Sequence, residues 1–159
     1  MIRKLPSKDE HVICEIVNEA AEAYKDVIPN DCYHEPYMPI EELRHEMKSM
    51  TFFGWEKEGK IVAVIGFQPV KDVTLIRHAY VLPDCQRKGI GTMLLNHLKQ
   101  MTKTKSLLVG TWADATWAID FYQKQGFDLM PNKNELLMRY WEIPQRQVET
   151  SVVLGIKNW

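Results

Sequence analysis

Two closely spaced glycines, Gly89 and Gly91, follow an apolar stretch and precede a run of residues with helical periodicity. Glycine lacks a Cβ atom, so the backbone at these positions can approach a ligand closely and adopt angles that other residues avoid. The run from Thr92 to Met101 is predicted to be a helix whose first free amides and positive dipole end face this turn. Arg87 and Lys88 add cationic side chains at the same place. The turn is therefore predicted to hold an anion such as a pyrophosphate.

Two other phosphate-binding patterns fit this turn poorly. A dinucleotide-binding fingerprint requires a third glycine three residues after the second one, where this chain has Leu94. A P-loop requires glycine followed by lysine and then serine or threonine, whereas Lys88 precedes Gly89 here. A nucleotide-binding domain of either kind is therefore disfavoured.

Two strings of the chain resemble motifs of the GCN5-related N-acetyltransferase (GNAT) superfamily. Its acetyl-coenzyme A motif is a strand, Val-x-Pro, Gln/Arg-x-x-Gly-x-Gly/Ala and a helix, and these places are filled by Val81, Pro83, Gln86, Gly89 and Gly91. Residues 118–127, Ala-Ile-Asp-Phe-Tyr-Gln-Lys-Gln-Gly-Phe, resemble the late helix of the family, Ala-x-x-Phe-Tyr-x-x-x-Gly-Phe. The separation of the two strings leaves room for one helix and one strand, as in the family. The resemblance covers at least residues 52–142.

The resemblance implies that acetyl-coenzyme A (acetyl-CoA) binds as a co-substrate, mostly through backbone amides. The end of the strand near Val81 would hold the pantetheine arm in the manner of an added strand. The expected cofactor-binding residues are Val81, Leu82, Gln86, Arg87, Lys88, Gly89, Ile90, Gly91 and Thr92. No metal is expected, because the cysteines and histidines lack metal-ligand spacing.

Tyr122, in the Phe-Tyr pair of the second string, is the expected catalytic residue. In the family this tyrosine commonly donates a proton to the departing coenzyme A thiolate, and a phenol of pKa about 10 suits such a donor at neutral pH. The alternative is a half-buried tyrosine that packs on the sheet. The chain departs from relatives at Ala115, where an asparagine is frequent, and at Leu75, where the histone-acetylating branch carries a glutamate base. A histone-type base is therefore not expected.

The acceptor site is expected between the first two helices and on the strand that leads into the glycine turn. The loop of residues 31–38 is dense in aromatic and ionisable groups, and the resemblance implies that it walls the acceptor pocket. The candidate substrate-binding residues are Tyr33, His34, Glu35, Tyr37 and His78, and His34, Glu35 or His78 can serve as a base. Strand alternation predicts that Arg77 and His78 point to opposite faces. The competing interpretation is a capped loop with aromatic packing and a structural histidine.

Composition is consistent with a small cytoplasmic enzyme. The chain has 159 residues, a net charge of −1 and a pI of about 6.5, so no general attraction to nucleic acid or an anionic membrane is expected. Its 3 cysteines suggest neither a disulfide framework nor a metal site. The start of the chain argues against a signal peptide, and the longest apolar stretch, residues 61–67, is too short to span a bilayer.

The predicted elements follow the order ααβββαβαββ, that of the GNAT fold, an α/β (α+β) domain with a mixed, mainly antiparallel sheet flanked by helices. Hydrophobic periodicity and turn residues define them. They are helices from Ser7 to about residue 25, from Pro39, from the glycine turn to Met101 and over 116–125, and strands over 52–58, 60–68, 73–82, 106–111, 127–130 and 135–141. A single domain is expected over 1–143, followed by a tail, 144–159, with one candidate strand at 151–154.

The expected function is therefore transfer of an acetyl group from acetyl-CoA to a primary amine of a small molecule or peptide, by direct attack. The alternative is a non-catalytic module that binds acyl-coenzyme A as a sensor or partner subunit. Both require Gly89 and Gly91, and only the enzyme requires Tyr122 or a base. The acceptor stays unnamed, and a homodimer is an option because dimers are common in the family.

Overall fold

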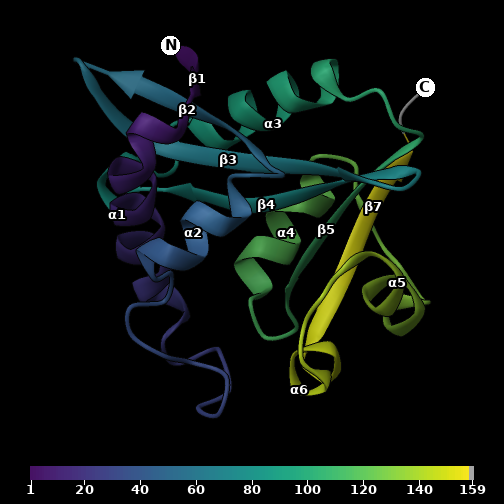
Figure 1. The fold of residues 1–159 in the computed structure, drawn as a ribbon. Helices are drawn as coiled ribbons and strands as arrows, with labels where there is room; N and C mark the ends of the chain where they lie inside the picture. Colours follow the sequence, from purple (N-terminus) through teal and green to yellow (C-terminus); the bar gives the residue numbers. More distant parts are fainter. Residues whose placement is uncertain (158–159) are drawn as a thin grey trace. The chain divides into compact units, whose positions relative to one another are not determined.

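The computed structural model describes residues 1–157 (Figure 1). These residues belong to two compact units. The first unit contains Met1–Ala23, His34–Gln68 and Ile76–Met101, and the second contains Tyr24–Tyr33, Pro69–Leu75 and the chain from Thr102 onward. The described residues contribute seven strands, and the strand pairs given below are antiparallel. No helix within residues 1–157 has both the length and the apolar character needed to cross a membrane.

The first unit is built on the long hairpin expected from the sequence. Strand β2 (Thr51–Lys57) pairs with β3 (Lys60–Val70) through a turn in which Glu58 and Gly59 have φ of 52° and 80°. Backbone with positive φ at both turn residues matches the twist of the flanking strands. Strand β4 (Val73–Val81) follows, and then helix α3 (Ile90–Met101).

A short N-terminal strand, β1 (Ile2–Leu5), was not predicted. It pairs with the other edge of β2, from Ile2 opposite Trp55 to Leu5 opposite Phe52. Only Leu5 of its four residues is buried, so the strand carries too little hydrophobic alternation to be recognised in the sequence.

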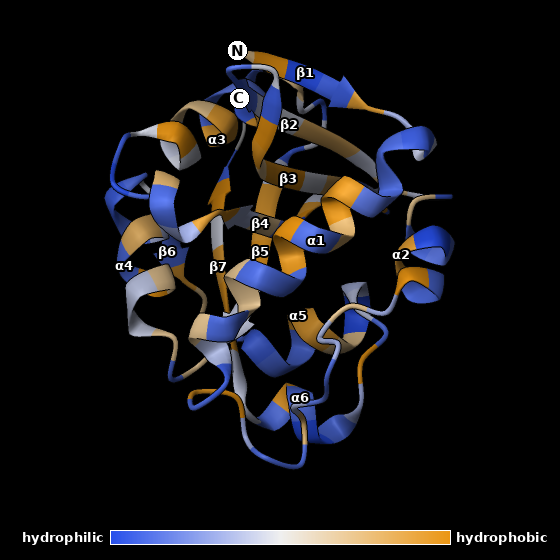
Figure 2. Ribbon diagram, turned by 90° about the vertical axis from the view of Figure 1, so that its left-hand side faces the viewer, coloured by the Kyte–Doolittle hydropathy of each residue, from blue (hydrophilic) through white to orange (hydrophobic). Residues whose placement is uncertain are grey.

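Helices cover both faces of the hairpin. On one face, α1 (Glu10–Ala20) and α2 (Ile40–Glu46) lie side by side and share a core cluster with Phe52 and Val64 (Figure 1). On the other face, Phe53 meets His97 of α3, edge to face with ring centroids 4.7 Å apart. Because side chains alternate along a strand, the two phenylalanines point to opposite faces. Figure 2 shows hydrophobic residues (orange) along β2 and mixed with hydrophilic ones (blue) along α1.

The second unit is built on two strands that are distant in sequence. Strand β5 (Ser106–Trp112) pairs with β7 (Ser151–Lys157) along its full length, and β6 (Asp128–Leu129) pairs with the other edge of β7. Strand β7 therefore extends the expected strand at 151–154. Helix α4 (Thr116–Lys124) lies between β5 and β6 in the sequence and is followed by Gly126 at φ 94°, as expected of a helix C-terminus.

The expectation of a strand over 135–141 was wrong. Residues Lys133–Tyr140 form helix α5, and Gln145–Glu149 form the short helix α6. Leu137 and Tyr140, three residues apart, are buried, whereas Met138 is 71% exposed. Strand alternation from Leu137 would have buried Glu135 and Arg139, both of which are exposed. The segment also lacks the β-branched residues that favour strands.

Candidate active site

The glycine turn begins where β4 ends and is held by contacts of its own. A single 3-10 turn, Pro83–Cys85, follows the strand, and the Cys85 amide donates to the Leu82 carbonyl at 2.9 Å. The Gln86 side chain folds back so that its Nε2 donates to the Val81 carbonyl at 3.1 Å. Gln86 therefore braces the turn through its side chain.

Backbone amides line the turn. Arg87 has φ of 63° and Gly89 has φ of 80°, and such alternation turns successive N–H groups toward a common point. The backbone hydrogen bonds of helix α3 begin with the Met93 amide, which donates to the Gly89 carbonyl at 3.0 Å. The backbone N–H groups of residues 87–91 make no hydrogen bond to any residue of 1–157. They are available to an anion at the positive end of the helix.

The space around the turn also suits a bound anion. A Cβ atom built on Gly89 would meet nothing within 4 Å, so the backbone borders open space. Arg87 and Lys88 are exposed, and neither pairs with a carboxylate of the described chain. These features fit a pyrophosphate, because donors and positive charge converge without competing protein acceptors.

The other expected cofactor residues have more mixed surroundings. The Leu82 amide already donates to the Val62 carbonyl at 2.9 Å, and the side chain of Ile90 is buried in the core. Thr92 is half-buried and has an interaction of its own. This leaves the Leu82 carbonyl and the Ile90 amide for contact with a cofactor, and all of these assignments stay predictions.

The part of the expected acceptor loop that lies in the first unit is ordered by local contacts. His34 Nδ1 lies 2.9 Å from the Pro36 carbonyl, and its ring stacks on that of Tyr37, with centroids 6.4 Å apart. Tyr37 is half-buried against the first core cluster, while His34 and Glu35 are exposed. Tyr33 belongs to the second unit and is half-buried there.

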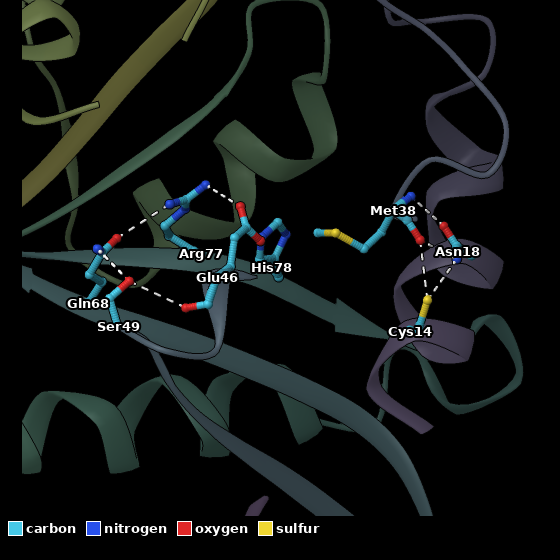
Figure 3. A network of polar contacts seen from close by, with 8 residues as sticks. All are labelled: Cys14, Asn18, Met38, Glu46, Ser49, Gln68, Arg77 and His78. Carbon is cyan, nitrogen blue, oxygen red and sulfur yellow. Dashed lines mark hydrogen bonds and ion pairs between the residues drawn. The ribbon is translucent and has the colours of Figure 1, made fainter. Parts of the chain in front are cut away.

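Asn18 of α1 fixes the end of this loop. Its Oδ1 accepts from the Met38 amide at 2.7 Å, and its Nδ2 donates to the Met38 carbonyl at 3.0 Å (Figure 3). Cys14 Sγ donates to the same carbonyl at 3.2 Å, and burial raises the pKa of this thiol. The thiol is thus a hydrogen-bond donor and a poor nucleophile at neutral pH.

The expectation that Arg77 and His78 point to opposite faces was wrong, because both contact Glu46 at the end of α2. Arg77 donates from NH2 to Glu46 Oε1 at 2.9 Å, and His78 Nε2 lies 2.7 Å from Glu46 Oε2 (Figure 3). His78 has φ of 52°, outside the extended region, and this breaks the regular pleat of β4. Its ring stacks on Phe52 with centroids 6.2 Å apart.

Glu46 is the residue of this cluster that sequence reasoning missed. Burial by itself raises the pKa of Glu46, but the hydrogen bond and charge of His78, with the charges of Arg77 and His45, outweigh burial and lower it. The carboxylate is therefore ionised at neutral pH. One clue was present in the sequence: an acidic residue at a helix C-terminus opposes the helix dipole and calls for a cationic partner.

Tyr122 lies on α4 in the second unit and is 6% exposed. Its ring contacts Phe121, with centroids 5.1 Å apart, and Phe127, at 5.5 Å. Burial, with a smaller effect from Tyr24, raises the pKa of Tyr122 well above its ordinary value. No described residue hydrogen-bonds its hydroxyl, yet no enclosed polar side-chain atom in the described chain lacks a partner. The hydroxyl oxygen therefore touches accessible space and keeps its proton at neutral pH.

No metal centre accompanies these groups within residues 1–157, where no three histidine, cysteine or acidic side chains converge as ligands. All three cysteines are free thiols.

Sequence comparisons match residues 13–127 to the model of the acetyltransferase (GNAT) family. The peptidyl-lysine N-acetyltransferase YiaC of Escherichia coli (strain K12) is 30% identical over 76 residues, 48% of this chain and 49% of that protein. The UPF0157 protein YqkA of Bacillus subtilis (strain 168) is 29% identical over 113 residues, 68% of this chain and 32% of that protein. The chain spans about half and about a third of the lengths of these two relatives.

Solved structures share the fold along nearly the whole chain. The PaiA N-acetyltransferase of Thermoplasma acidophilum, in complex with coenzyme A, superposes with a TM-score of 0.76 at 18% identity, over 99% of this chain and 98% of that one. The ribosomal-protein-S18-alanine N-acetyltransferase of Escherichia coli gives 0.73 at 19% identity, over 99% and 93%. These matches confirm the expected fold class, a mixed α/β fold with a mostly antiparallel sheet flanked by helices.

Proposed function

Because the chain belongs to the acetyltransferase (GNAT) family, we propose that it transfers the acetyl group of acetyl-CoA to a primary amine of a small molecule or peptide. The observation that carries this proposal is the row of backbone N–H groups at residues 87–91, at the start of α3, which have no acceptor among residues 1–157. The pyrophosphate of acetyl-CoA is the part of that molecule which such a row of donors suits.

In this proposal the glycine turn binds the co-substrate, and other residues donate and accept protons. The amides of 87–91 bind the pyrophosphate, and exposed Arg87 and Lys88 add positive charge beside it. The backbone near Val81 orients the pantetheine arm. When bound, the thioester supplies an activated acyl carbon. The neutral amine forms the C–N bond, the C–S bond breaks, and the sulfur takes up a proton as it leaves.

Tyr122 is the proposed donor of that last proton. Its raised pKa keeps the phenol protonated at neutral pH, and its hydroxyl touches accessible space although its ring is buried. A donor must hold its proton until charge develops on the leaving group; the raised pKa ensures this, although it also makes the phenol a weaker acid. The phenol regains a proton from the amine nitrogen, through water, as the new amide forms.

The acceptor is proposed to be a primary amine that enters beside the loop of residues 31–38. One relative is named for peptidyl-lysine acetylation, which makes a lysine side chain one of the acceptors to test. His34 and Glu35 are exposed on this loop, and the half-buried aromatic rings of Tyr33 and Tyr37 offer apolar surface to the methylene chain of an amine.

The proposal is tested by measuring coenzyme A release with three amines: a lysine-bearing peptide with a blocked N-terminus, a peptide with a free α-amino group, and spermidine. Release that depends on the amine, with an acetylated product in the mass spectrum, is expected for at least one of them. Calorimetry run in parallel reports binding of acetyl-CoA. Tight binding without release for any amine would instead favour the non-catalytic acyl-CoA-binding module.

A further inference from the structure

We propose that Glu46 and His78 act as a proton-accepting pair in this site, in which Glu46 orients the imidazole and its Nδ1 takes a proton from the acceptor ammonium group. This inference rests on the proposed function, which it deepens by assigning the base and the residue that positions it. Glu46 is a positioning residue, since it acts through His78.

The pair is held rigidly. The His78 Nε2 to Glu46 Oε2 distance is 2.7 Å, and the two side chains are 14% and 13% exposed. The second carboxylate oxygen is occupied by Arg77, which also donates from NH1 to Gln68 Oε1 at 3.3 Å. Gln68 in turn donates to Ser49 Oγ at 3.2 Å, and Ser49 Oγ donates to the Glu46 carbonyl at 3.4 Å. Figure 3 shows these hydrogen bonds, which form a closed ring through Glu46.

The geometry decides which nitrogen of His78 carries the proton. An ionised carboxylate only accepts hydrogen bonds, so Nε2 must be the protonated nitrogen of the neutral ring. Its Nδ1 then carries a lone pair. No described residue hydrogen-bonds Nδ1, and no enclosed side-chain nitrogen in the described chain lacks a partner. The lone pair therefore has some accessible surface, and the acceptor amine is proposed to lie there.

The backbone places this ring unusually. A φ of 52° is uncommon for a residue other than glycine and is strained, so it persists only where the surroundings enforce it. Here it turns the ring away from the regular strand alternation, onto Phe52 and toward Glu46. His78 is on the same strand as Val81, whose end is the proposed site of the pantetheine arm.

Charge around the pair keeps the carboxylate ionised. The described charged or titratable groups that act on Glu46 are His78 and Arg77 from β4 and His45 from α2, and Phe52 of β2 adds no charge. The permanent charge of Arg77 and the hydrogen bond from His78 hold the carboxylate in the accepting form. When the ring takes up the proton, the Glu46 carboxylate stays 2.7 Å from its Nε2.

The proton balance of the step is simple. An acceptor ammonium, R–NH₃⁺, gives one proton to Nδ1 and becomes R–NH₂, and His78 becomes an imidazolium that later releases the proton to solvent. The amine then forms the C–N bond as the C–S bond breaks. The sulfur takes up one proton, so the net products are the amide, free coenzyme A thiol and one proton.

The first test needs no activity. Long-range ¹H–¹⁵N NMR at a pH where the ring is neutral reports the tautomer of His78 in the whole protein. The expected result is a protonated Nε2 and a bare Nδ1 in the wild type, with the second tautomer gaining population in Glu46→Gln, because an amide can donate to Nε2. A protonated Nδ1 in the wild type would overturn the proposal.

The second test compares kcat with the amine, among the three above, that is acetylated fastest. Glu46→Gln and His78→Gln are expected to lower kcat about 10-fold and about 100-fold, with affinity for acetyl-CoA unchanged. The loss should shrink as pH rises toward the ordinary pKa of that amine, about 8 for an α-amino group and about 10.4 for a lysine, because more amine is then neutral without a base.

Matched controls separate this effect from general damage. Glu10→Gln removes another half-buried carboxylate in an ion pair, with Arg44 at 3.0 Å, and His97→Gln removes another half-buried histidine on a phenylalanine. Both should keep wild-type kcat. If the wild type is active and the Glu46 and His78 variants keep kcat within about threefold of it, the proposed role of the pair is overturned and the proposed function stands. A wild type that acetylates none of the amines would overturn the proposed function as well.

Discussion

Replacing Arg87 by glycine separates binding from folding at the glycine turn. Arg87 has φ of 63°, a region in which side chains other than hydrogen are strained, and its own side chain is exposed. Glycine adopts this angle freely, so Arg87→Gly removes the cation while it preserves the path of the backbone. The amides of the neighbouring residues should stay in place. The substitution should therefore change affinity for acetyl-CoA and little else.

The size of each effect follows from this geometry. Relief of the left-handed conformation is worth about 1–2 kcal/mol, and the added freedom of glycine in the unfolded chain costs about 0.5–1 kcal/mol. The free energy of unfolding should then change by about 1 kcal/mol or less, or roughly 2–4 °C in Tm for a chain of this size. Loss of one charge-assisted contact to a phosphate at an exposed site costs roughly 1–2 kcal/mol, which is about 5- to 30-fold in Kd.

Calorimetric titration with acetyl-CoA and a thermal melt measure the two quantities on the same sample. Glu58→Gly is the matched control, because Glu58 is also exposed and charged, with φ of 52°, and lies in the β2–β3 turn. Both variants should melt close to the wild type, and only Arg87→Gly should bind more weakly. Equal affinity in both variants, with both folded, would show that Arg87 makes no contact with the pyrophosphate.

Four further outcomes are expected. Gly91→Asp should abolish acetyl-CoA binding in calorimetry and leave the fold intact, because it adds bulk and negative charge beside the pyrophosphate while an acid suits the first turn of a helix; wild-type affinity would refute the binding site. Tyr122→Phe should lower kcat on the order of 10²-fold with little change in acetyl-CoA affinity, and a kcat within about threefold, with chemistry rate-limiting, would exclude a proton donor. Tyr33→Ala or Tyr37→Ala should raise KM for the amine and spare affinity for acetyl-CoA, and the opposite pattern in steady-state kinetics would move the acceptor pocket elsewhere. The pKa of Glu46 is lowered in the fold, so the stability that Glu46 contributes is present above its ordinary pKa of 4.5 and is lost as pH falls through the lower folded value. In chemical denaturation, Glu46→Gln should therefore weaken the dependence of the free energy of unfolding on pH in the acid range. An unchanged dependence on pH would contradict this.

Features that depend on local sequence were predictable. Gly59 and Gly89 both have φ of 80°, and each marks a turn that residue type alone identified, since glycine is favoured where φ is positive. The helix that follows the glycine turn and the hairpin before it also have clear periodicity. The approximate place of the glycine turn therefore followed from the order of strand, glycines and helix.

Features that depend on tertiary contacts could not be predicted from the sequence. Leu136, Met138 and Tyr140 alternate as the apolar face of a strand would. Only the packed second unit, which buries Leu137 with Tyr140 and leaves Met138 exposed, shows that the segment is a helix. Glu46 is 32 residues from His78 in the chain, so no local spacing relates them. The positive φ of His78 brings the two together. Histidine adopts positive φ more often than most residues, but that preference does not single out one position within a strand.

The central claim is that the backbone of residues 87–91 binds acetyl-CoA, and an amide NMR titration tests it most directly. In ¹H–¹⁵N correlation spectra of the wild type, the amides of 87–91 should shift most as acetyl-CoA is added. The amide of Gly59, in a turn with the same φ of 80° and the same open surroundings, should stay unchanged. If the amide signals of residues 87–91 did not shift at saturating acetyl-CoA, the claim would be contradicted.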